Sequence, residues 1–166
     1  TGAVSLAQNK ATTDVLVTSA KNLELKSQGD IVGAKVAAMG GDLVVRSATG
    51  GIKLTSATTT QNLDMSAAGL ISLGAITVPG NILLSSTQTG GVSTLALNAG
   101  KSISVSAAGA SGHLKLTTLT AKAGTVALNA GGTLSAGNAT ATGNITLDAT
   151  GNASTGAVTS STGIVD

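Results

Sequence analysis

The sequence predicts an all-β fold, a right-handed parallel β-helix of about eight coils, and three observations support this prediction. Short starts, in which one apolar residue is followed two positions later by another, recur at steps of 19 to 23 residues. Apolar residues alternate with polar or small residues after each start, as in a half-buried strand. The intervening segments are rich in Ser, Thr, Gly and Asn, which disfavours the helix of a strand–helix repeat.

Nine such starts define eight repeats of about 19–20 residues and the beginning of a ninth. They are Val4, Leu23, Leu43, Leu63, Ile82, Ile103, Val126, Ile145 and Ile164. Because side chains two positions apart lie on the same face of a strand, each start and the apolar residue two positions later should face the core. The column between them, which includes Glu24, Val44 and Asp64, is mixed and should face solvent.

Two further apolar columns follow in each repeat. The second inward set is Ile31, Ile52, Ile71, Val92, Leu114, Leu134 and Ala153. The third set lies five residues later and comprises Val17, Val36, Ala57, Ile76, Leu97, Leu119, Ala139 and Val158. We therefore expect three short strands per coil, which form three walls around one core.

The composition favours a thin, uniform core and excludes several functions. The chain is 42% hydrophobic but contains no Phe, Tyr, Trp or Cys, and only 10% of its residues are charged. Without aromatic residues or a basic run, nucleic-acid binding is disfavoured, and without Cys no disulfide or thiolate metal site is possible. We expect no membrane span, and a single β-helical domain over residues 1–166 that is a fragment of a longer protein.

A column of short polar side chains precedes the first strand of each repeat. It reads Asn22, Asp42, Asn62, Asn81, Ser102, Thr125, Asn144 and Gly163. Such residues bond to nearby backbone groups at turns, and stacked Asn side chains pair in other parallel arrays. We expect this column to form a coil-corner ladder rather than a binding motif.

A threonine column is the clearest surface pattern. Its aligned positions read Thr18, Ala37, Thr58, Thr77, Asn98, Thr120, Thr140 and Thr159. Threonine is a good strand residue and stacks well on a solvated face, so a structural role is the first interpretation. The alternative is an ice-binding face, although Met39, Pro79, Gly100 and Lys122 interrupt its companion column.

Few residues suggest chemistry. His113 is the only histidine, so no His pair for zinc exists, and we expect a solvated turn residue. Glu24 and Asp64 make the best acidic pair, two strand spacings apart, but no basic clamp or aromatic platform is expected beside them. Glycine pairs such as Gly40-Gly41 and Gly131-Gly132 lack the following helix of a phosphate loop, and we expect them to provide positive φ at corners. The sequence predicts no catalytic residue, cofactor or metal.

The repeat pattern resembles the shaft of filamentous haemagglutinin and related exoproteins of bacterial two-partner secretion. The segments that carry the resemblance include "GDLVVRSATGGIKL", "GNILLSS" and "LNAGKSISVSAAGASG". The resemblance implies export across a Gram-negative outer membrane through a partner transporter, followed by secretion or display at the cell surface. Since the "NPNL" and "NPNG" motifs of the secretion domain are absent, the chain matches the shaft better than the secretion domain.

We therefore expect a non-enzymatic shaft segment of a secreted or surface-exposed adhesin that mediates cell adhesion, with a cell-surface receptor or glycan as partner and a role in virulence. Three alternatives remain open. The first is the β-helical stick of a contact-dependent growth inhibition protein that delivers a toxin. The second is an ice-binding solenoid that uses the Thr column. The third is a polysaccharide-degrading β-helix enzyme that uses Glu24 and Asp64.

Overall fold

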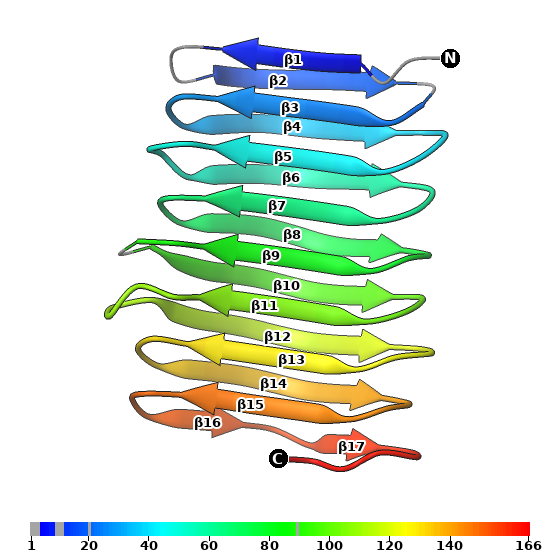
Figure 1. The fold of residues 1–166 in the computed structure, drawn as a ribbon, viewed down its shortest axis with the longest axis vertical. Helices are drawn as coiled ribbons and strands as arrows, with labels where there is room; N and C mark the ends of the chain where they lie inside the picture. The colour runs from blue at the N-terminus through cyan, green and yellow to red at the C-terminus, as the bar shows by residue number, and fades with distance from the viewer. Residues whose placement is uncertain (1–3, 9–11, 20, 89) are drawn as a thin grey trace.

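The computed structural model describes residues 4–8, 12–19, 21–88 and 90–166, and these form two parallel β-sheets wound into one solenoid (Figure 1). No helix occurs in these ranges. The chain passes along one sheet, turns a corner, returns along the other sheet and descends one level with each circuit (Figure 1). The winding is right-handed, as expected for connections between parallel strands, so the predicted fold class is confirmed.

Sheet A contains the short strands, each of five residues, in the order in which they occur along the chain. They are β1 (Val4–Gln8), β3 (Leu23–Ser27), β5 (Leu43–Ser47), β7 (Leu63–Ala67), β9 (Ile82–Ser86), β11 (Ile103–Ala107), β13 (Val126–Ala130) and β15 (Ile145–Ala149). Each begins at a start predicted from the sequence.

Sheet B contains the longer return strands, most of them eight or nine residues long. They are β2 (Thr12–Ser19), β4 (Ile31–Ala38), β6 (Ile52–Thr59), β8 (Ile71–Val78), β10 (Gly91–Ala99), β12 (His113–Ala121), β14 (Leu134–Ala141) and the short β16 (Ala153–Thr155). A further short strand, β17 (Val158–Ser160), also pairs with β14.

The register repeats from turn to turn without a slip in sheet A. Leu43 faces Leu23 on one side and Leu63 on the other, and the same pairing of equivalent residues continues to Ile145. The prediction that the ninth repeat begins at Ile164 is wrong by one residue, because Ile145 pairs with Val165. The Ile145 N–H donates to the Ile164 carbonyl at 2.9 Å, and this bond fixes the register.

The second and third expected strands of each coil run together into one bent strand. Burial in β8 follows the pattern buried at Ile71, Leu73, Ile76 and Val78, so two consecutive residues, Gly74 and Ala75, face outward in the middle. This double outward step is the bend that divides sheet B into two walls. In the last turn the bend separates β16 from β17, and three strands are present there as expected.

The core is a single column of aliphatic side chains. Each inner turn buries three side chains from its short strand and four from its long strand, as β7 and β6 illustrate. Almost all are Leu, Ile, Val or Ala, because the space between the sheets is thin and the same in every turn. The expected second and third inward sets are buried in the inner turns, whereas Ala153 in the last turn is exposed.

Glycine at the corners serves close approach rather than the positive φ that we expected. Neither Gly41 nor Gly131 adopts the left-handed backbone conformation. A Cβ on Gly41 would lie 1.6 Å from Asn22 Oδ1, and one on Gly131 would lie 2.3 Å from the Gly109 carbonyl oxygen. The preceding turn therefore excludes a side chain at these positions.

Candidate functional site

The corner at which each long strand passes into the next short strand holds a ladder of side-chain hydrogen bonds, and we call it the ladder corner. The Asp42 N–H donates to Asn22 Oδ1 at 2.9 Å. Asn62 donates both its N–H and its side-chain amide to Asp42 Oδ1, at 3.0 and 2.9 Å. Asn81 does the same to Asn62 Oδ1, at 2.8 and 3.1 Å. Each side chain thus satisfies a backbone N–H of the following turn where the sheet ladder is interrupted.

The ladder continues beyond the asparagines. The Ser102 N–H donates to Asn81 Oδ1 and the Thr125 N–H donates to Ser102 Oγ, both at 3.1 Å. In the last turn the Ile164 N–H donates to Asn144 Oδ1 at 3.2 Å. All five predicted ladder residues (Asn22, Asp42, Asn62, Asn81 and Asn144) therefore lie in one column and accept backbone hydrogen bonds.

The opposite corner, where each short strand passes into the next long strand, has fewer side-chain bonds, and we call it the open corner. Asp30 Oδ1 accepts the Gly51 N–H at 2.7 Å. At the equivalent place further along, His113 Nδ1 lies 3.2 Å from the Thr133 backbone nitrogen, which donates to it, and 2.8 Å from Thr133 Oγ1. His113 is exposed, as predicted, but it is the first residue of β12 rather than a turn residue. It also holds the next turn in place, which the sequence did not indicate.

The threonine column lies on the second half of sheet B, beyond the bend. Asn98 pairs with Thr77 and Thr120, and Thr140 pairs with Thr120 and Thr159, so these residues form one line across adjacent turns. At the other end Ala37 pairs with Thr18 and Thr58. From Ser56 to Thr159 the outward residues that the strands contribute to this wall carry no charge, and the exposed Lys122 lies just beyond the end of β12. The wall is a surface of small, uncharged side chains.

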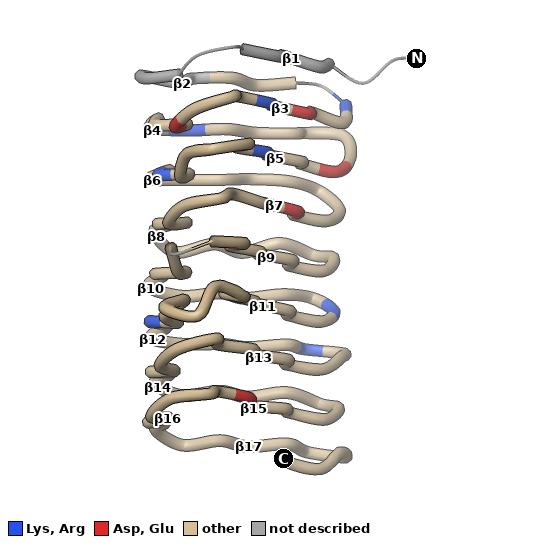
Figure 2. Tube along the Cα trace, turned by 60° about the vertical axis from the view of Figure 1, so that its left-hand side comes forward, with Lys and Arg blue, Asp and Glu red and all other residues tan. Residues whose placement is uncertain are grey.

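Four of the five charged residues that the structure describes in sheet A lie in β3, β5 and β7, and the fifth, Asp148, lies in β15 (Figure 2). Val44 lies between Glu24 and Asp64 in the register, so the two acidic residues are two strand spacings apart, about 9.6 Å. Lys26 Nζ lies 2.9 Å from Glu24 Oε1. Arg46 reaches diagonally across to Asp64 and pairs with both of its carboxylate oxygens.

These contacts correct one expectation, because a basic residue does accompany each acidic residue of the pair. The hydrogen bonds that Arg46 donates to Asp64 raise the pKa of the Arg46 guanidinium, and the negative charges of Asp64 and Glu24 add to this effect. Arg46 therefore stays protonated over the whole neutral range. The sequence signal was available: Lys26 and Arg46 each stand two residues after a member of the outward column and so share its face.

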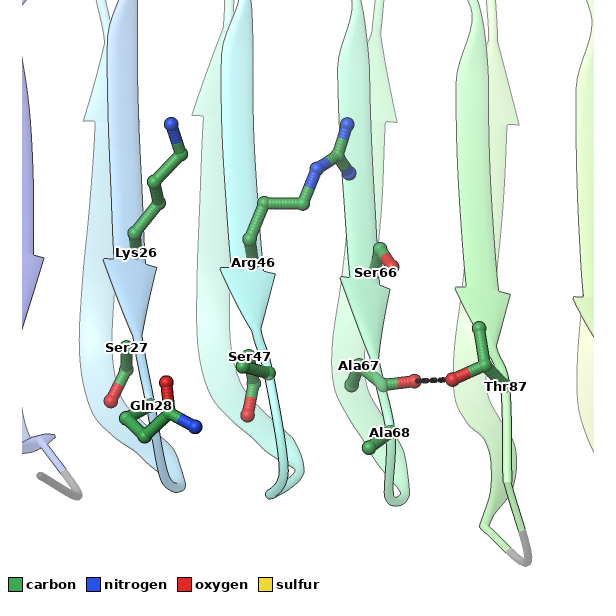
Figure 3. Close-up of a pocket in the computed structure, with 10 residues that line it drawn as sticks. Lys26, Ser27, Gln28, Arg46, Ser47, Ser66, Ala67, Ala68 and Thr87 are labelled. Atoms are coloured by element: carbon green, nitrogen blue, oxygen red, sulfur yellow. Dashed lines mark hydrogen bonds between the residues drawn. The ribbon is translucent and has the colours of Figure 1, made fainter. Parts of the chain in front are cut away.

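A shallow hollow opens beside these charged residues at the open corner, where β3, β5, β7 and β9 end (Figure 3). Lys26 and Arg46 line one side, and Ser47, Ser66 and Thr87 contribute hydroxyl groups. The hydroxyl groups of Ser47 and Thr87 are already engaged, since Ser47 Oγ donates to the Gly29 carbonyl at 2.8 Å and Thr87 Oγ1 donates to the Ala67 carbonyl at 3.4 Å. The two cationic side chains extend away from the base of the hollow, toward Glu24 and Asp64 (Figure 3).

The geometry constrains what Asp64 can do chemically. A carboxylic acid that transfers a proton must have an oxygen free to meet the substrate, whereas Arg46 occupies both oxygens of Asp64. Action of Asp64 as an acid or base would first require this ion pair to open. Its chemistry in the observed arrangement is that of an ion pair that joins two turns.

No group of three or more His, Cys, Asp or Glu side chains is placed to hold a metal ion in the described ranges. Within the same ranges, no helix is long and apolar enough to cross a membrane.

Comparison with known proteins gave no relative: no family model matches the chain, and no similar curated protein or solved structure was found. The resemblance to the filamentous haemagglutinin shaft therefore depends on the repeat period and the quoted segments. Of what that resemblance implies, the parallel β-solenoid is confirmed by the structure.

Proposed function

We propose that this chain is a segment of the shaft of a secreted or surface-displayed bacterial adhesin of the filamentous haemagglutinin type. The observation that supports the proposal best is the unbroken stacking of sheet A, in which equivalent residues pair in register from β1 to β15. A shaft needs length and stiffness, and a solenoid adds about 4.8 Å of length for each turn. The sides of the rod present no free strand edge to other chains.

The ladder corner supports a mechanical role. Its bonds run from one turn to the next, in the same direction as the backbone bonds of the sheets. A bend at this corner would have to separate side-chain and backbone bonds together. The rod is therefore braced at a corner as well as along its walls.

In this proposal the partners are an outer-membrane transporter of two-partner secretion, for export, and a receptor or glycan on a host or bacterial cell. The chain itself holds the binding region of the full-length protein at a distance from the cell. The related proposal, in which the shaft carries a toxin in contact-dependent growth inhibition, uses the same geometry and differs only in what the shaft carries.

Deletion of one whole turn tests the shaft function. Removal of residues 63–81 joins Asn62 to Ile82. Ile82 then takes the place of the strand start Leu63, and Asn62 takes the place of the ladder residue Asn81. We expect the full-length surface protein to be displayed normally, to be shorter by about 4.8 Å and to bind its cells as before. Reach would be measured by electron microscopy and binding by counting adherent bacteria.

Deletion of residues 63–72 is the matched control, because it removes half a turn and places outward residues in the core. We expect it to abolish the folded rod. Loss of adhesion in the whole-turn variant, with normal surface display, would place the receptor site in that turn and contradict a shaft role. Loss of growth inhibition of neighbouring cells without loss of adhesion would favour toxin delivery.

The uncharged wall favours a second candidate function, ice binding. Thr120 and Thr140 are neighbours in one line, with Thr118 and Asn138 beside them on adjacent turns. Regular arrays of this kind would place hydroxyl groups at the strand spacing of about 4.8 Å. Thermal hysteresis at micromolar concentration that is lost in Thr120→Tyr, but kept in Ser104→Tyr on sheet A, would support this function, and its absence would remove it.

A further inference from the structure

The longest connection between two described strands lies at the open corner, where residues 108–112 join β11 to β12. Within this loop the Gly112 N–H donates to the Gly109 carbonyl at 2.7 Å. Ala110 and Ser111 are therefore the central residues of a β-turn, and both are exposed. The loop projects further from the rod than the corner between β13 and β14, which has only three residues (Figure 1). Exposed loop tips with small side chains are the places at which proteases preferentially cut folded proteins.

The tip of this loop makes no backbone hydrogen bond to a neighbouring turn within the described part of the chain. The last bond before the tip is the one that the Ala108 N–H donates to the Ser86 carbonyl at 2.9 Å. The first bond after it is the one that the Gly112 carbonyl accepts from the Gly132 N–H, also at 2.9 Å. Between these points only the bond inside the turn holds the backbone. A protease that draws the tip into its active site therefore has to break this one bond first.

The open corner between β5 and β6 is held much more firmly, although it also places an exposed alanine before a hydroxyl residue. These residues are Ala48 and Thr49, and the N–H of each donates to a carbonyl of the preceding turn at 2.9 Å. The N–H groups of Gly50 and Gly51 donate to side-chain oxygen atoms at 3.1 and 2.7 Å. All four N–H groups of this corner are thus bonded, so several bonds must break before a protease can bind it.

A cut in the longer loop would not separate the rod into two parts. After a cut between Ala110 and Ser111, one fragment contains β1 to β11 and the other contains β12 to β17. The fragments still share the parallel pairs β10–β12 and β11–β13. They also share the core, in which the buried Leu97 and Leu119 are register partners from opposite sides of the cut. We therefore expect the fragments to stay together until the chain is unfolded.

We propose that the Ala110–Ser111 bond is the site at which an endoproteinase with a small S1 pocket, of the elastase type, first cuts the folded protein, and that the cut protein remains one rod. In the reaction the carbonyl carbon of Ala110 gains the oxygen of a water molecule. The C–N bond breaks, and its electron pair and both hydrogens of the water pass to the nitrogen of Ser111. The products are a carboxylate on Ala110 and an ammonium group on Ser111. The inference goes beyond the shaft function and does not depend on it.

Digestion of the folded 166-residue chain with pancreatic elastase tests the proposal. Denaturing electrophoresis and mass spectrometry identify the fragments over time, and size-exclusion chromatography without denaturant shows whether they stay together. We expect the first fragments to be residues 1–110 and 111–166, and we expect them to elute together at the volume of the uncut chain. Cleavage between Ala48 and Thr49 should be at least about tenfold slower, because more hydrogen bonds must open there.

Two variants separate the effect of the loop from that of the alanine it carries. Deletion of Ala110 and Ser111 shortens the connection to three residues and should slow cleavage at this corner at least about tenfold, although Ala108 remains there. Ala110→Arg keeps the loop and should make it the first site of cleavage by trypsin. The exposed Lys115 is the internal control for trypsin, because it lies in β12 between β10 and β14 and should be cut at least about tenfold more slowly. Thermal unfolding shows whether each variant is folded.

Three results would overturn the proposal. The first is an uncut Ala110–Ser111 bond in the folded chain while elastase cuts the unfolded chain in a parallel reaction, or a first cut at another bond. The second is elution of the two fragments at separate volumes without denaturant. The third is trypsin cleavage of the folded Ala110→Arg variant at Lys115 as fast as in the loop, since access would then not depend on the loop.

Discussion

The two corners of the solenoid both connect one sheet to the other, but they differ in length and in side-chain hydrogen bonding. At the ladder corner three or four residues join a long strand to the next short one, and the residue just before the short strand accepts a hydrogen bond from the next turn. At the open corner the connection varies more, and six residues separate Ala107 from the buried Leu114. The length of the ladder corner varies by only one residue, because each acceptor must meet one particular N–H of the next turn.

This difference shows where the repeat tolerates change. The two longest repeats, which begin at Ile82 and Ile103, have additional residues in the open corner. A backbone turn closes the longer loop there, since the Gly112 N–H donates to the Gly109 carbonyl at 2.7 Å. We therefore expect insertions, loops and attached groups to be accepted at the open corner and rejected at the ladder residues.

An insertion of Gly-Ser should separate the corners most clearly. Placed between Asn81 and Ile82, it removes the two bonds from Asn81 to Asn62 and the bond from Ser102 to Asn81. At about 1 kcal/mol each, the loss is about 3 kcal/mol of unfolding free energy. The same insertion between Ala110 and Ser111 lengthens an exposed loop and should cost less than about 1 kcal/mol. Urea unfolding measures both, and equal losses would contradict the distinction.

Replacement of one ladder residue should have the next largest effect. Asn62→Ala leaves the Asn81 N–H without its acceptor and removes the bond to Asp42, so we expect a loss of about 2 kcal/mol. Asn62→Ser should recover part of this loss, because Ser102 already accepts a backbone N–H through its hydroxyl. Chemical denaturation of the three proteins gives the comparison, and a Ser variant no better than Ala would show that the acceptor is not what matters.

A buried threonine of sheet B, which lies between the two corners, offers a stabilising substitution. Thr94 is 4% exposed, pairs with Leu73 and Leu116, and its hydroxyl has no hydrogen-bond partner among the described residues. Thr94→Val removes this buried polar group at nearly the same volume and should raise the unfolding free energy by about 1 kcal/mol. Thr140→Val, on the exposed face, should change it by less than about 0.5 kcal/mol. A destabilised Thr94→Val protein would indicate that the hydroxyl is satisfied in solution.

The smallest effect is expected at His113, the open-corner counterpart of a ladder residue. His113→Ala removes one acceptor at an exposed site and should cost about 0.5 kcal/mol, less than Asn62→Ala. Faster hydrogen exchange of the Thr133 amide would locate the loss, and His113→Asn should restore protection. An effect as large as that of Asn62→Ala would mean that the two corners contribute equally to the free energy of unfolding.

Much of the fold was predictable because each step of it is local. The eight short strands begin at the predicted residues, since alternation in five residues and a period near 20 leave only one register that buries Leu23, Leu43 and their equivalents. The corner column was predictable for the same reason, because Asn, Asp and Ser recur at one position just before each start. The bent strand was not predictable, because two consecutive outward residues look like the gap between two strands.

The contacts between columns needed the structure. Arg46 meets Asp64 rather than its register partner Ser66, because a long side chain can reach diagonally to the next strand. The role of His113 depends on Thr133, which lies 20 residues away and reaches it only when the turns are stacked. Register at the end of the chain also depended on one backbone bond, and the start predicted at Ile164 moved to Val165.

The sequence by itself determined the period, the inward columns and the corner ladder of this protein, because a repeated pattern of apolar and polar residues has only one economical way to bury its apolar side. The tertiary structure decided which side chains of neighbouring turns bond to one another and which glycines lie against the preceding turn. These properties depend on distances of a few ångströms between residues about 20 positions apart, and only the stacking of the turns sets those distances.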